Sequence, residues 1–246
     1  MNQFFLDELK CISKDIELEK MNPQIYCGDE INIIGDESGI SAYIAGYNMS
    51  VSAKKKTDVN VITEGKLYNK ELYDEISDEF GEKGNLAFYE NFDSFSARGE
   101  SSKKKHFYFI ANLQLQEYND SSFVNEKLKS LKKWLEYSSE QKGEFILVSV
   151  FNFEHPFSEG IAACSERELE AIAATDSVYR QSRMVCELEE VCRRHLNSGN
   201  KGVKAVRFDN VFGPLVKNTS NIGFEEIIKE LFALAAIKSA SSLNLS

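Results

Sequence analysis

The sequence has few of the residues that build metal centres and disulfide scaffolds. It contains only three histidines, and its five cysteines are odd in number and show no Cys-x-x-Cys spacing. Zinc sites and disulfide frameworks need such residues at regular spacings. We therefore expect reduced thiols, no disulfide framework and no metal ion.

Long apolar runs and dense basic patches are also lacking. No segment approaches the roughly 20 apolar residues of a membrane-spanning helix. The opening MNQFFLDELKCISKDIELEK is acidic and amphipathic, unlike a signal peptide. A net charge of -10 argues against a nucleic-acid surface. Two lysine runs, 54–56 and 103–105, are expected in solvated loops. These features predict a cytoplasmic protein that binds neither membrane nor nucleic acid.

What the chain does contain is a repeated change between two kinds of segment. Short apolar runs rich in β-branched or aromatic residues predict strands: EINIIG, DVNVIT, NLAFYE, HFYFIANL, EFILVSVFNF and VKAVRFDNVFG. Amphipathic segments between and around them predict helices at 3–20, 40–53, 66–80, 121–140, 165–196 and 223–238.

Strands that are apolar on both faces and alternate with helices indicate a parallel sheet covered on both sides. The expected fold class is therefore α/β, a Rossmann-like doubly wound parallel sheet with helices on both faces. At 246 residues, one main domain is sufficient. We divide the chain into an N-terminal helix (1–24), the Rossmann-like domain (25–238) and a polar tail (239–246).

The turn after the first strand, GDESGISA, contains Gly35, Gly39 and Ala42. A dinucleotide-binding site requires small residues here. One makes the tight turn, one lets the backbone approach the pyrophosphate, and one lets the helix pack closely against the strand. If Gly39 is the middle glycine, Asp36 occupies the place of the first. Glu64 follows the second strand, where a ribose-binding acid would stand. The alternative interpretation is an acid-capped turn that binds nothing, since carboxylates repel phosphate at a helix N-terminus.

The most specific stretch is VKAVRFDNVFGP, residues 203–214, which follows a predicted helix containing SVYRQSRMVCELEE, residues 177–190. With the order of the other elements, these motifs resemble the extended short-chain dehydrogenase/reductase family, specifically the nucleotide-sugar epimerases and dehydratases. The resemblance covers roughly residues 30–228. It implies NAD or NADP as cofactor, a nucleotide sugar as substrate, and a role in bacterial surface-polysaccharide metabolism. It also implies a homodimer formed through the helix at 121–140 and the tyrosine helix.

The resemblance assigns roles to individual positions. Tyr179 corresponds to the general acid/base, and Arg183 stands where the family has a lysine that binds the nicotinamide ribose. Ser149, the third expected catalytic residue with Tyr179 and Arg183, opens the usual serine cluster that helps hold the sugar, and Phe151 takes the place of the catalytic member of that cluster. The expected cofactor-binding residues are Gly35, Gly39, Ala42, Glu64, Ala111, Asn112 and Arg183, and the expected substrate-binding residues are Asn152 and Asn210.

Several positions depart from the family pattern: Asp36 in the turn, Phe151 in the serine cluster and Arg183 in the tyrosine helix. The chain also stops soon after the last predicted helix, so the C-terminal substrate subdomain is expected to be missing or minimal. Two hypotheses therefore stand. One is an NAD(P)-dependent epimerase, dehydratase or reductase. The other is a non-catalytic Rossmann-like scaffold or regulatory partner, paired in a hetero-oligomer with an active paralogue.

Overall fold

The structure is a computed structural model that describes Leu6 and residues 28–36, 39–51, 56–65, 67, 69–112, 121–151, 177–209, 211–212 and 222–223. Its centre is a parallel sheet of six strands: β1 (Glu30–Ile34), β2 (Thr57–Ile62), β3 (Gly84–Tyr89), β4 (Lys105–Asn112), β5 (Glu144–Phe151) and β6 (Val203–Asp209). Their order across the sheet is β3-β2-β1-β4-β5-β6. This is the strand order of a Rossmann sheet, with the topological switch between β1 and β4. The expected fold class is confirmed.

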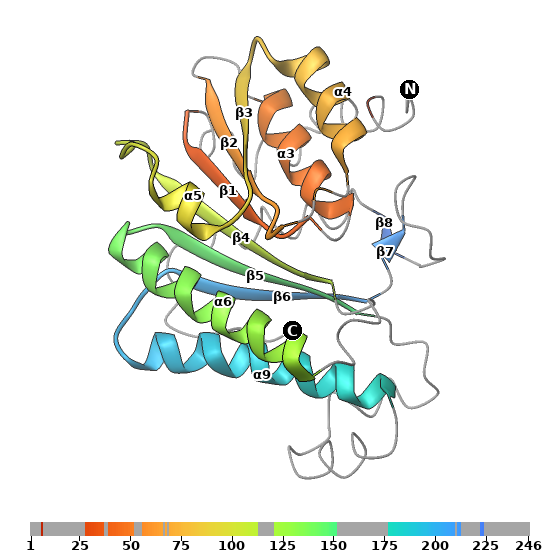
Figure 1. Ribbon diagram of the computed structural model, residues 1–246, viewed down its shortest axis with the longest axis vertical. Coiled ribbons are helices and arrows are strands. Elements are labelled where there is room, and N and C mark those ends of the chain that lie inside the picture. The colour runs from red at the N-terminus through yellow and green to blue at the C-terminus, as the bar shows by residue number, and fades with distance from the viewer. Residues whose placement is uncertain are drawn as a thin grey trace.

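Helices cover both faces of the sheet (Figure 1). Helices α3 (Gly39–Val51) and α4 (Lys70–Phe80) lie on one face, and α5 (Phe92–Ser96), α6 (Ser121–Glu140) and α9 (Ser177–Asn197) on the other. The period of two along each strand divides the core accordingly, because Ile31 and Ile33 pack in the first layer and Ile34 in the second. A separate pair, β7 (Val211–Phe212) and β8 (Ile222–Gly223), is also parallel.

The predicted helices and strands coincide closely with the observed ones wherever the structure describes the chain. Two features differ. The short helix α5 was not predicted; its N-cap Asn91 and Ser94 form a capping box. Lys105 was expected in a solvated loop but begins β4, is buried, and donates to Gln141. The predicted first and last helices, residues 165–176 of the predicted helix at 165–196 and the polar tail lie outside the described residues. The exceptions are Leu6, which is helical as expected, and Gly223, which lies in β8 and not in a helix.

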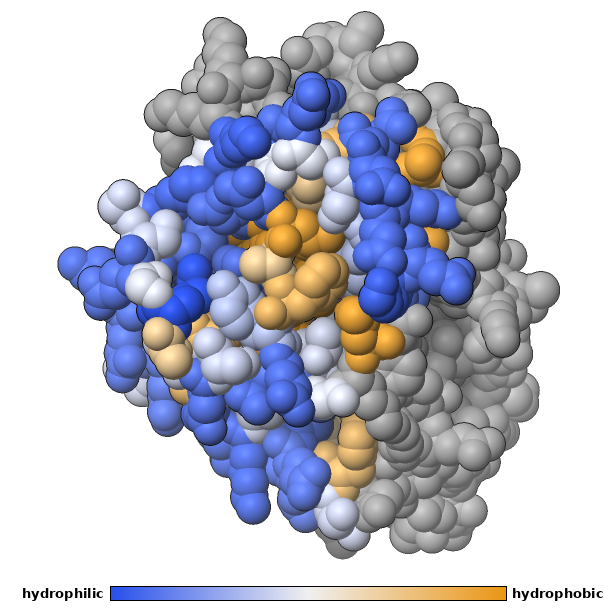
Figure 2. Space-filling view, turned by 45° about the horizontal axis from the view of Figure 1, so that its top comes forward, coloured by the Kyte–Doolittle hydropathy of each residue, from blue (hydrophilic) through white to orange (hydrophobic). Residues whose placement is uncertain are grey.

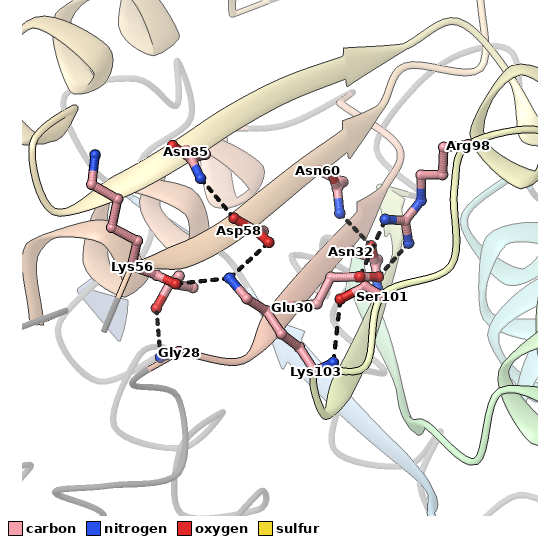
Figure 3. A network of polar contacts seen from close by, with 11 residues as sticks. Gly28, Glu30, Asn32, Lys56, Asp58, Asn60, Asn85, Arg98, Ser101 and Lys103 are labelled. Carbon is pink, nitrogen blue, oxygen red and sulfur yellow. Dashed lines mark hydrogen bonds and ion pairs between the residues drawn. The ribbon is translucent and has the colours of Figure 1, made fainter. Parts of the chain in front are cut away.

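A polar network crosses the amino-terminal part of the sheet (Figure 3). Both terminal guanidinium nitrogens of Arg98 donate to the Glu30 carboxylate, Nη1 at 3.1 Å. The guanidinium lies 4.0 Å from the centre of the Phe95 ring. On the same sheet face the Asn60 amide donates to Asn32 Oδ1 at 2.8 Å. Nearby, Lys103 pairs with Asp58 at 2.7 Å. Pairing offsets the cost of burying such groups, although Asn32 Nδ2 and Arg98 Nε have no hydrogen-bond partner in the described residues.

The Glu30–Arg98 pair generates a stability prediction. The Glu30 side chain is 1% exposed and that of Arg98 17%. Arg98→Met would leave a buried carboxylate without its counter-charge, and we expect it to lower the free energy of unfolding by about 3 kcal/mol. Arg193→Met is the matched control, because Arg193 pairs with Glu190 on the solvent side of α9. That change should cost less than about 1 kcal/mol in urea titrations. Equal losses in the two variants would contradict the prediction.

Candidate functional site

The carboxyl ends of the central strands are where a Rossmann sheet binds its ligand. Gly35 follows β1 directly and has φ of +91°, a backbone region that favours glycine. Its N–H donates to the carbonyl of Ile62 at 2.9 Å, which holds the turn against the end of β2. Gly39 opens α3 and is buried, and Ala42 packs in the core one turn later. The three small residues thus lie where a strand-to-helix turn needs them.

Among the described residues of this turn, Asp36 accepts the most hydrogen bonds. Its side chain is fully buried. Oδ1 accepts from the Ser41 hydroxyl at 2.7 Å, the Tyr73 hydroxyl at 2.7 Å and the Asn69 amide at 2.8 Å. Oδ2 accepts from the Asn69 backbone N–H at 3.0 Å, and the Asn69 amide also reaches the Asp36 carbonyl at 3.1 Å. The carboxylate therefore joins the turn after β1 to the start of α4.

The bonds of Asp36 explain an oddity at the N-terminus of α4. Asn69 is the N-cap of this helix, yet its side chain makes no capping bond, because that side chain is turned to Asp36. A carboxylate near the first turn of a helix is favourable for the helix dipole. One interpretation of the sequence makes Asp36 an acid cap of α3. The observed contact with α3 is to the Ser41 side chain, and the contacts with the beginning of α4 are more numerous.

Tyr73 completes this junction. Burial raises the pKa of its hydroxyl well above the usual value, and the negative charge of Asp36 and the hydrogen bond to it raise the pKa further. The phenol therefore stays protonated and remains a donor. Its ring packs edge-on to Phe88 of β3, with ring centres 5.3 Å apart. Neither Asn69 nor Tyr73 was predicted from the sequence as a site residue. A polar residue just before an amphipathic helix signals Asn69 as a cap, but no pattern pairs Tyr73 with Asp36.

Glu64 stands at the end of β2, as expected, but it faces α6. Its carboxylate accepts from Lys127 at 3.0 Å and from the Ser130 hydroxyl. Burial by itself would raise the pKa of Glu64, whereas the charge of Lys127 and the hydrogen bonds from Ser130, Lys127 and Trp134 lower it below the usual value overall. Glu64 has φ of +49°, a left-handed conformation that costs a non-glycine residue energy.

Lys127 was not predicted as a site residue either, although its position in α6 indicates a buried lysine. It lies on the buried side of α6 with Leu131 and Trp134, at i, i+4 and i+7 spacing, where an apolar residue is usual. Its ammonium lies 5.2 Å from the centre of the Phe109 ring. A lysine at a core position of a helix needs an acid to pair with, and Glu64 is that acid here.

Ser149 lies near the end of β5, between Ala111 of β4 and Arg207 of β6. Its side chain is 1% exposed, and its hydroxyl has no hydrogen-bond partner within the described part of the chain. Most buried hydroxyls are bonded, so an orphan of this kind calls for an explanation. Ser149 shares its sheet face with Phe145, which packs in the core layer under α6 and α9.

The tyrosine helix is α9, and Figure 1 shows it beginning at the end of the molecule where β5 and β6 finish. Tyr179 and Arg183 lie in its first two turns; the side chains described in α9 begin at Met184. Asn112 and Phe151 are the last residues of β4 and β5. Their side chains are not among those that the structure describes. Asn152 and Asn210 lie outside the described residues.

The sheet order therefore places several of the expected site residues together, at the carboxyl ends of neighbouring strands. β2, β1, β4 and β5 are consecutive neighbours, and Glu64, Gly35, Ala111 and Ser149 lie at or near their carboxyl ends. Within the described residues no three His, Cys, Asp or Glu side chains are placed to hold a metal ion. His106, which is buried, bonds instead to Asp29 at 2.9 Å. None of the helices in the described part of the chain has the length and apolar character to cross a membrane.

Comparison with known proteins adds little to this geometry. The chain matches no protein-family model and no curated protein. Among solved structures it is similar to the crystal structure of the aureusimine biosynthetic cluster reductase domain, with 11% sequence identity and a TM-score of 0.43. The match covers 88% of this chain and 60% of that one, so the chain spans about 60% of the length of that reductase domain. A likeness at this level carries no information on chemistry.

The Asp36 junction predicts a large and specific stability effect. Asp36→Ala would leave several buried donors without an acceptor, and we expect a loss of about 3–5 kcal/mol in the free energy of unfolding. Tyr73→Phe removes one donor and leaves the carboxylate its others, so about 1–2 kcal/mol is expected. Asp74→Ala, on the exposed side of α4, should change little. Urea unfolding followed by circular dichroism measures all three. If Asp36→Ala were as stable as Asp74→Ala, the bonds of Asp36 would not contribute to the stability of the fold, and the prediction would be wrong.

Proposed function

We propose that this chain is a Rossmann-like relative of the NAD(P)-dependent nucleotide-sugar epimerases and dehydratases whose dinucleotide turn has become a structural junction. It then acts as a non-catalytic scaffold or regulatory partner of an active paralogue, in the metabolism of bacterial surface polysaccharide. The observation that carries this proposal is the buried carboxylate of Asp36, bonded to Ser41, Asn69 and Tyr73 at the end of β1.

The physical reason is electrostatic. A pyrophosphate binds a Rossmann turn because backbone N–H groups and the helix dipole attract negative charge. Asp36 places a carboxylate within this turn, where the low dielectric makes repulsion between like charges strong. The carboxylate cannot rotate away without giving up its bonds to Asn69 and Tyr73. The turn is thus held in a form that disfavours a dinucleotide.

Substitutions in the catalytic set point in the same direction. Arg183 replaces the lysine that the resemblance leads one to expect, and a guanidinium is a wider, planar group that does not substitute for an ammonium. Phe151 offers no hydroxyl to a sugar. Hydride transfer requires cofactor, acid/base and substrate to be held together, so these changes compound one another.

A second candidate function is an active NAD(P)-dependent epimerase, dehydratase or reductase of nucleotide sugars. Ser149 favours it, because an unbonded buried hydroxyl near the end of β5 is suited to a ligand oxygen. In that case Tyr179 acts as acid/base and Arg183 binds the nicotinamide ribose. Ser149, Asn152 and Asn210 hold the sugar.

Calorimetric titration with NAD⁺, NADH, NADP⁺ and NADPH tests the proposal. We expect no binding to the wild-type protein and measurable binding to Asp36→Asn. That variant removes the charge but keeps one oxygen for Ser41, Tyr73 and the Asn69 amide. Tyr73→Phe is the matched control, because it disturbs the same junction and keeps the charge, so it should not bind.

The opposite result is equally clear. Tight binding of any of the four dinucleotides by the wild-type protein would overturn the proposal. Turnover of a nucleotide sugar that is lost in Ser149→Ala would then establish the second candidate. Circular dichroism of each variant confirms that the fold is retained.

A further inference from the structure

Strand β3 is an edge of the sheet with little protection. It pairs with β2 on one side, and within the described residues no backbone bond is made on its other side. Natural edge strands are usually blunted by charges, prolines or bulges, because free N–H and C=O groups recruit another strand. The six residues of β3, GNLAFY, include neither a charged residue nor a proline. Phe88 is 43% exposed, one of two large apolar side chains exposed in the described chain.

The direction of the backbone groups can be derived from the pairing with β2. Thr63 N–H donates to the Tyr89 carbonyl at 2.9 Å, so the backbone of Tyr89 faces β2. In a parallel ladder alternate residues face the same neighbour, so Ala87 also faces β2. Leu86 and Phe88 therefore direct their N–H and C=O groups outward, away from the sheet.

We propose that two copies of this chain join their β3 edges as antiparallel strands about a twofold axis at Ala87. Leu86 of each copy then lies opposite Phe88 of the other, and both residues have the outward N–H and C=O groups that such a hydrogen-bonded pair exchanges. Ala87 meets its own copy as a non-hydrogen-bonded pair, in agreement with its inward backbone. A twofold axis requires a self-complementary surface, and this register provides one.

The side chains support the same arrangement. Leu86 is half-buried and Phe88 exposed, both on the α4 face of the sheet, so pairing them across the interface covers apolar surface on both copies. An apolar area surrounded by hydrophilic residues is visible in Figure 2. Charges at the ends of β3 are also complementary. Lys83 precedes the strand and Glu90 follows it, so the antiparallel register brings Lys83 of one copy near Glu90 of the other.

The outward face of α6 is less suited to such a contact. Its exposed side chains include Glu126, Lys129, Lys132, Lys133 and Glu136. Charged residues are depleted at the centre of stable interfaces, because each must lose its hydration. An interface at β3 is therefore distinct from the helix-mediated dimer that the resemblance implies.

Light scattering after size-exclusion chromatography, from low to high micromolar concentration, tests the proposal. The full chain should be a dimer, and Phe88→Lys should shift it to monomer by placing a charge opposite Leu86. Leu67→Lys is the matched control, because Leu67 is similarly exposed, at 37%, but lies outside β3. That variant should remain dimeric. A wild-type protein that is monomeric at every concentration would overturn the proposal.

A covalent test fixes the register. Ala87→Cys should form an intermolecular disulfide under mild oxidation, because non-hydrogen-bonded pairs bring the two side chains close. Asn85→Cys is the control: two such residues would lie four positions apart across the interface and should not cross-link. Non-reducing gels are read against the wild-type protein with its own cysteines. A dimer that persists in Phe88→Lys and fails to cross-link at Ala87 would place the interface elsewhere and contradict the proposal.

Discussion

The buried carboxylate of Asp36 is the constraint on which the candidate site depends. It lies where β1 ends and α3 begins, and it holds Asn69 and Tyr73 at the start of α4. One side chain thus joins the turn to α3 and α4. A dinucleotide-binding turn of a Rossmann sheet has a glycine for the tight turn, and here a buried carboxylate and its donors stand beside Gly35. Under the proposed function, binding of an anion at this turn and integrity of the junction compete.

At the end of the next strand, β2, an expected ligand-binding residue is likewise bonded to other residues of the protein. Glu64 stands where a ribose-binding acid is expected, but it is paired with Lys127 and bonded to Ser130 of α6. Ser149 differs from Glu64, because its buried hydroxyl has no hydrogen-bond partner in the described residues. One residue expected to bind the cofactor, Glu64, is thus bonded internally, whereas the hydroxyl of Ser149, expected in the catalytic set, has no partner in the described residues.

The fold was predictable because it follows from patterns that repeat along the chain. Apolar runs such as EFILVSVF become central strands, and the 3.6-residue period places Leu131 and Trp134 against the sheet. The candidate site was predictable only as far as topology carries it, to the carboxyl ends of β1, β2, β4 and β5. That Tyr73 would donate to Asp36, 37 residues earlier, depends on how α4 packs on α3, which no local pattern records. The position of Lys105 in β4 was missed because a lysine run in a polar stretch is usually solvated.

A crystal structure of the protein soaked with NADH tests the central claim most directly. The account predicts that the Asp36 carboxylate keeps its bonds to Asn69 and Tyr73 and that no pyrophosphate lies against the first turn of α3. A dinucleotide bound along that turn, with Asp36 displaced from Tyr73 or still in place beside the phosphates, would contradict it.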